Sequence, residues 1–79
     1  MSKTRLIHLK YLGRDSWERP VYEDDNGVLW KDVDPRADRK ADLCTSVDNT
    51  FDGEPDTGMK YLEAYQNVLV IFVPGRDVW

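Results

Sequence analysis

The sequence has very little cysteine and histidine: Cys44 and His8 are the only residues of their types. A secreted domain of this size usually carries paired cysteines as covalent staples, so a lone cysteine favours a reducing compartment and a cytoplasmic location. Nowhere do apolar residues run together for the roughly 18 positions that a transmembrane helix needs, and no apolar signal-peptide stretch follows the start. We therefore expect no membrane association.

Motifs for catalysis or cofactor binding are also missing, including a phosphate loop, a dinucleotide fingerprint, Cys-x-x-Cys and His-Glu-x-x-His. His8 and Cys44 could in principle form a base and a nucleophile, but no glycine-rich elbow or helix end accompanies the cysteine. Asp32 and Asp34 share a face at a strand end, where carboxylates are common. We expect no catalytic residue and no cofactor, and therefore a protein that is not an enzyme.

Positive charge is scarce after the first strand. Residues 1–20 hold five basic and two acidic side chains, whereas residues 21–79 hold six basic and thirteen acidic ones, and the net charge is −4. An acidic domain does not attract phosphate groups, so nucleic acid is not an expected partner.

The chain does have aromatic residues, nine of them in 79 residues. A domain of this size buries only about 60% of the surface that its unfolded chain exposes, so large rings are efficient core material. We therefore predict one small folded domain over residues 1–79.

Two segments predict β-structure through their local pattern. Arg5–Leu12 alternates between apolar and polar residues, which is typical of a strand with one buried face. Asn26-Gly27 lies between two β-prone runs and predicts a hairpin, because glycine accepts a positive φ without a steric penalty. We expect a three-residue loop over residues 25–27, which places Tyr22 opposite Trp30.

The second half of the chain predicts shorter elements. Residues 43–47 resemble a short edge strand, and residues 48–58 a long irregular loop. Residues 59–65 carry a modest apolar stripe that predicts one short helix. Val68–Val73 is a continuous apolar run, which predicts a central strand covered on both faces. Together these elements predict a mainly β, small α+β fold: a curled antiparallel sheet or half-open barrel of four or five short strands with one short helix.

An acidic segment has part of the spacing of a calcium loop. Asp52, Glu54 and Asp56 take the first, third and fifth positions of a twelve-residue stretch, and Glu63 takes the twelfth. However, Thr57 stands at the sixth position, where the loop needs glycine for its sharp turn. A solvated or partner-binding acidic loop is the more ordinary interpretation, and we predict no metal site.

Two tryptophans are candidates for a recognition surface. Trp17 and Trp79 lie near arginines in the sequence or at the end of the chain, and tryptophan and arginine dominate interface hot spots. The alternative is that Trp17 covers the mouth of the barrel and Trp79 folds back onto it.

The stretch Tyr11–Val33, followed by Leu43-Cys-Thr and Phe51–Asp56, resembles a family of small proteins, the large polyvalent protein associated domains carried by conjugative elements and phages of gut Clostridia. The resemblance extends over roughly residues 5–79. It implies an accessory protein of a mobile genetic element, and it brings no active-site residues with it.

The leading hypothesis is therefore a non-catalytic protein-interaction module that serves a mobile element. Its expected partner is a protein, bound through Trp17, Asp52, Glu54, Asp56 and Trp79. The alternative is an acidic mimic of DNA that inhibits a host defence nuclease, motivated by the acidic balance after residue 20. The sequence does not indicate an oligomeric state.

Overall fold

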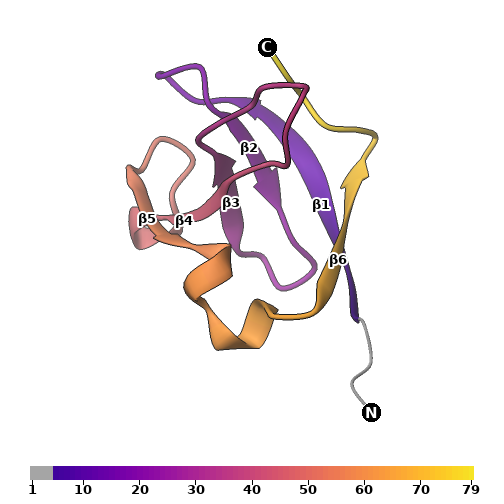
Figure 1. Ribbon diagram of the computed structural model, residues 1–79. Helices are drawn as coiled ribbons and strands as arrows, with labels where there is room; N and C mark the ends of the chain where they lie inside the picture. Colours follow the sequence, from indigo (N-terminus) through magenta and orange to yellow (C-terminus); the bar gives the residue numbers. More distant parts are fainter. Residues whose placement is uncertain (1–4) are drawn as a thin grey trace.

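The computed structural model describes residues 5–79, which form one curled, mixed β-sheet (Figure 1). Its strands are β1 (Arg5–Arg14), β2 (Pro20–Glu23), β3 (Leu29–Asp32), β4 (Leu43–Ser46), β5 (Pro55–Gly58) and β6 (Val68–Val73). They are ordered β5-β4-β3-β2-β1-β6. The first five form an antiparallel meander, and β6 returns parallel to β1. The mainly β prediction is confirmed, although there are six strands and the sheet is mixed.

The hairpin between β2 and β3 has the predicted register. Tyr22 is paired with Trp30, and Gly27 takes a φ of +80° at the end of a three-residue loop. Asp24 closes this loop by accepting hydrogen bonds from the backbone N–H groups of Asn26 and Val28 at 2.8 and 2.9 Å. The local chemistry of this segment therefore determines its structure.

The core lies on one face of the sheet, which the alternate buried residues of β1 share. Alternate residues of β1 point into it as predicted, and the strand extends two residues beyond the predicted end, to Arg14. The buried cluster comprises Ile7, Leu9, Tyr22, Trp30 and Leu43. Edge-on ring contacts join Tyr22 to Phe72 at 4.9 Å and Trp30 to Tyr65 at 4.8 Å, so the core is built largely from aromatic rings.

The predicted helix over residues 59–65 does not form. Two single 3₁₀ turns, η2 (Met59–Tyr61) and η3 (Glu63–Tyr65), take its place, and Leu62 between them is extended. Met59, Leu62 and Tyr65 still pack against the core. Their spacing of three residues matches the 3.0 residues per turn of a 3₁₀ helix better than the 3.6 of an α-helix.

The segment predicted as an irregular loop, residues 48–58, is more ordered than expected. It begins within a 3₁₀ turn, η1 (Val47–Asn49), and ends in strand β5. Because β5 pairs with β4, β4 is an inner strand and not the predicted edge strand. Asn49 fixes the segment to the hairpin, since its side chain accepts from the Leu29 N–H at 2.7 Å and donates to the Gly27 carbonyl at 2.9 Å.

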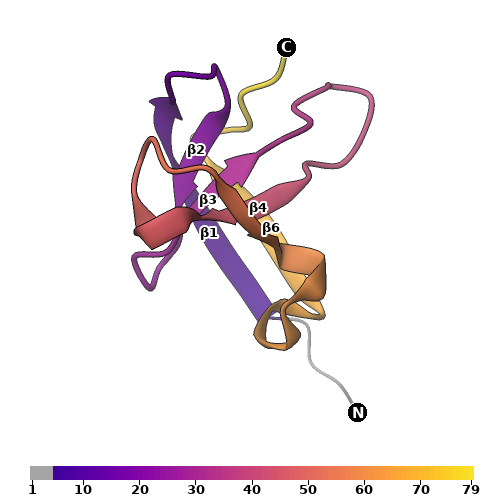
Figure 2. The same ribbon diagram turned by 90° about the vertical axis from the view of Figure 1, so that its left-hand side faces the viewer.

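Strand β6 is correctly predicted as a strand but is wrongly placed at the centre of the sheet. It lies at an edge, next to β1 alone (Figures 1 and 2). Its residues alternate between half-buried and exposed, and Leu69, Ile71 and Val73 are 52%, 37% and 42% exposed. The apolar run therefore reflects two different surfaces, the core on one face and solvent on the other. Within residues 5–79, no helix has the length and hydrophobicity needed to cross a membrane.

Candidate functional site

The structure brings part of the predicted recognition surface together at one end of the molecule. Trp17 lies in the turn between β1 and β2 and is 68% exposed, so it does not cover the mouth of the barrel. Asp52 accepts a hydrogen bond from the Ser16 N–H at 2.9 Å. A Glu54 oxygen lies 3.5 Å from Arg19 Nη1. The acidic segment is thus attached to the turn that carries Trp17.

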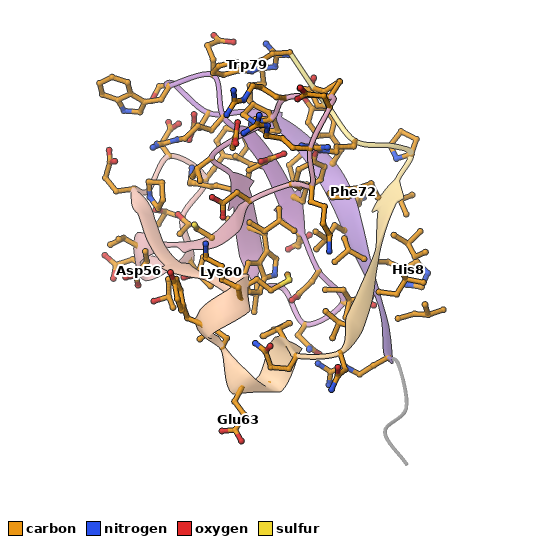
Figure 3. All side chains as sticks on the ribbon, in the orientation of Figure 1. His8, Asp56, Lys60, Glu63, Phe72 and Trp79 are labelled. Atoms are coloured by element: carbon orange, nitrogen blue, oxygen red, sulfur yellow. The ribbon has the colours of Figure 1, made fainter. Side chains whose placement is uncertain are left out.

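Trp79 lies at the same end as that turn (Figures 1 and 3). Its side chain is 66% exposed, while its backbone N–H donates to the Pro35 carbonyl at 2.9 Å. The end of the chain is also fixed by Asp77, two residues before Trp79. Asp77 accepts hydrogen bonds from Arg14 Nε and Nη2 at 2.8 and 2.9 Å and from the Tyr11 hydroxyl. These hydrogen bonds, of which those from Arg14 have the larger effect, lower the pKa of Asp77 to about 2.

The spacing of the calcium-loop candidate does not become a calcium site. Asp52 and Glu54 bind groups of the β1–β2 turn, Asp56 lies on β5, and Glu63 lies on η3, pointing away from the body of the molecule (Figure 3). Across the part of the chain that the structure describes, no three His, Cys, Asp or Glu side chains converge on a position where they could hold a metal ion.

A buried ion pair that the sequence did not predict lies beneath the acidic segment. The side chains of Asp15 and Lys31 are both fully buried, with Nζ 2.6 Å from Oδ2. Asp15 also accepts from Arg19 Nε and from the backbone N–H groups of Trp17 and Arg19. Burial by itself raises the pKa of Asp15, but the hydrogen bonds from Lys31 and Arg19 outweigh it and lower the pKa to about 2. Lys31 also donates a hydrogen bond to the Phe51 carbonyl, which ties the segment before β5 to the ion pair.

A second buried carboxylate organises the loop between β3 and β4. Asp32 is fully buried and accepts from the backbone N–H groups of Asp34 and Asp42 at 3.1 Å each. Its other oxygen accepts hydrogen bonds from Arg76 Nε and Nη2 at 3.3 and 3.2 Å. Arg76 also donates to the carbonyls of Arg39 and Arg36. Asp32 and Asp34 therefore do not form an acid–base pair open to a substrate; they stabilise the loop.

The only histidine and the only cysteine are not brought together. His8 is on β1, on the outer face of the sheet, with Nδ1 3.6 Å from Asp25 (Figure 3). Cys44 is on β4, and β2 and β3 lie between the two strands. Burial, followed by the charge of Asp42, raises the pKa of the Cys44 thiol, which disfavours the reactive thiolate.

A concave surface lies elsewhere, along β6, and the sequence did not predict it. We call it the β6 groove; its volume is about 430 Å³, within the range of protein ligand sites. One wall is β6 with Arg76, and the other is formed by the start of β4 and the 3₁₀ turns. The lining residues are Lys40, Ala41, Asp42, Leu43, Met59, Lys60, Tyr65, Gln66, Asn67, Val68, Leu69, Val70, Phe72 and Arg76.

The β6 groove has an apolar floor and a basic rim. Phe72 and Lys60 lie on opposite sides of it, from β6 and from η2 (Figure 3). Lys40 and Lys60 are exposed, and neither forms an ion pair with any residue that the structure describes. Asp42 is the only carboxylate among the lining residues. In a chain of net charge −4 this groove is locally positive.

No family model matches this chain, and no curated protein or solved structure matches it either. The resemblance to the large polyvalent protein associated domains therefore stays a prediction, and the site must be interpreted from its own geometry.

Proposed function

We propose that this chain is a non-catalytic protein-interaction module whose partner binds in the β6 groove. The observation that carries this proposal is the combination of an apolar lining with two lysines that have no ion-pair partner in the described chain. Concave apolar surfaces with a few charged groups are typical of binding sites, and the lysines favour a partner segment that carries carboxylates. Such a surface binds without any reacting group.

The use of the buried charges supports a non-catalytic function. The most deeply buried carboxylates, on Asp15, Asp24 and Asp32, each accept several hydrogen bonds from protein groups. All three hold turns and loops in place through these hydrogen bonds, and Asp24 also lines a small cavity of about 140 Å³. They support a role in the stability of the fold.

The DNA-mimic alternative receives less support. A mimic must present its carboxylates at the surface with a spacing like that of phosphates. Asp15, Asp24 and Asp32 are buried, and Asp34 and Asp77 form ion pairs with arginines. With Asp52 and Glu54, which bind groups of the β1–β2 turn, at least seven of the fifteen acidic side chains are thus engaged within the fold. The remaining context, a cytoplasmic accessory protein of a mobile element, is proposed from the lone cysteine and from the resemblance of the sequence.

The proposal is tested by quantitative affinity capture from cells that carry the protein, using four forms of the chain. Lys40→Glu with Lys60→Glu reverses the charge of the β6 groove. Asp52→Ala with Asp56→Ala alters the acidic segment, and Lys10→Glu is a matched control on the outer face of β1, where Lys10 is exposed and forms no ion pair in the described chain.

We expect a saturable protein partner that is lost with the groove variant and retained by the control and the acidic-segment variant. If the partner is lost only with the acidic-segment variant, the binding surface lies instead at the end of the molecule that carries Trp17. Equal recovery with all four forms would contradict binding at either surface.

A further inference from the structure

The outer edge of β6 carries unpaired backbone groups. Arg5 is the register partner of Val68, and its N–H donates to the Asn67 carbonyl at 3.2 Å. Because backbone groups point alternately to the two sides of a strand, this bond directs the N–H and C=O of Val68, Val70 and Phe72 away from β1. No strand within residues 5–79 pairs with that side.

The β6 groove reaches this edge and is not confined to one face of the sheet. Its lining includes Leu69 together with Val68 and Val70. Successive side chains of a strand point to opposite faces, so a cavity that touches all three also passes along the backbone between them. The unpaired N–H and C=O groups are therefore accessible from the groove.

We infer that the β6 groove binds an extended acidic peptide, which joins the sheet as a seventh strand beside β6. This inference rests on the proposed function and adds the binding mode. The peptide backbone forms hydrogen bonds with Val68, Val70 and Phe72, and its alternate apolar side chains lie on the floor of the groove. Its carboxylates lie within reach of Lys40 and Lys60 at the rim.

The positive charge of the groove favours an acidic peptide over a second copy of the same chain. Pairing of two β6 edges would bring Lys40 and Lys60 of both copies into one shared groove, and β6 itself carries no acidic residue to balance them. Like charges facing one another across an interface are unfavourable. An acidic peptide instead supplies the carboxylates that the groove lacks.

The probe is a displayed library of random decapeptides, selected against the full chain at low ionic strength. We expect enriched peptides with a net negative charge and apolar residues at alternate positions. Lys40→Glu with Lys60→Glu should weaken their binding about tenfold, whereas Lys10→Glu should leave it unchanged. Enrichment of basic peptides, or equal weakening by the two variants, would overturn the charge assignment.

Strand addition is tested with N-methylated forms of one enriched peptide. Only every second peptide N–H can face β6, so methylation at one set of alternate positions should weaken binding by about tenfold or more, and methylation at the other set should have little effect. Equal effects of the two sets would overturn strand addition. Selection of no peptide would also overturn it. A free chain that sediments as a dimer, when the Lys40→Glu, Lys60→Glu variant sediments as a monomer, would overturn it as well.

The two proposals fail separately. If a protein partner is captured through the groove but methylation shows no alternation, the interaction module stands and the added strand is wrong. If capture is also insensitive to the groove variant, both are wrong.

Discussion

Replacing Lys31 by methionine tests whether the buried ion pair stabilises the fold. Lys31→Met keeps the unbranched side chain up to the position of Cε but leaves the fully buried Asp15 without its 2.6 Å partner. Removal of one member of a buried pair typically costs 3–5 kcal/mol. Because Arg19 and two backbone N–H groups still bind Asp15, we expect the low end of that range, about 3 kcal/mol.

This loss is large for so small a domain. A chain of 79 residues has a total stability of about 4–12 kcal/mol, so the melting temperature of the Lys31→Met variant should fall by about 12–24 °C. Thermal unfolding followed by circular dichroism at pH 7 measures the change. Lys10→Met removes an exposed lysine that has no ion pair in the described chain, and it should alter stability by less than about 0.5 kcal/mol.

The pH dependence identifies the ion pair as the cause. The pKa of Asp15 is about 2 in the folded chain, below its ordinary value of 3.8, so its contribution to stability is complete above about pH 4 and is lost as the pH falls toward 2. The difference between the wild type and Lys31→Met should therefore shrink between pH 5 and pH 2. A difference that is constant over this range, or a Lys31→Met variant as stable as Lys10→Met, would show that the ion pair does not stabilise the fold.

Three further predictions, one of them with a control substitution, concern the loops and the chain end. Asp24→Ala leaves the buried Trp30 indole N–H without its acceptor and should cost about 2–3 kcal/mol in urea unfolding; a neutral effect would contradict the role of Asp24 in the hairpin. Gly27→Ala should cost about 1 kcal/mol because φ is +80°, whereas Gly75→Ala, in open space, should be neutral, and equal effects would speak against the turn. Asp77→Ala should lower the protection of the Trp79 amide against hydrogen exchange, taken relative to the rate of an unprotected amide at the same pH, as should acidification of the wild type from pH 4 to pH 2, and unchanged protection would exclude Asp77 as the anchor.

The parts of the fold that were predictable are those whose cause is local. Asn26-Gly27 and the alternation in β1 specify a turn and a buried face within a few residues, and both were correct. The stripe over residues 59–65 was misinterpreted as one short helix. A repeat of three residues is compatible with such a helix, but the chain forms two separate 3₁₀ turns. Pro55–Gly58 has poor β-propensity and forms a strand only because β4 lies beside it.

The candidate site depends on contacts that are distant in the sequence. Nothing near Lys31 indicates that Asp15 lies beside it, since the pair forms only when the β1–β2 turn folds next to β3. The apolar run of β6 was the one available signal for the groove. It was attributed to a strand buried on both faces, and a strand left open at an edge for a missing partner has the same sequence pattern.

Amide hydrogen exchange along β6 of the free, monomeric chain shows whether the outer edge of this strand is open. Alternating protection is expected: the backbone N–H groups of Leu69, Ile71 and Val73 point toward β1 and should be protected, whereas those of Val68, Val70 and Phe72 should exchange rapidly. Protection of all six amides would contradict an open edge, and the β6 groove could then not accept an added strand.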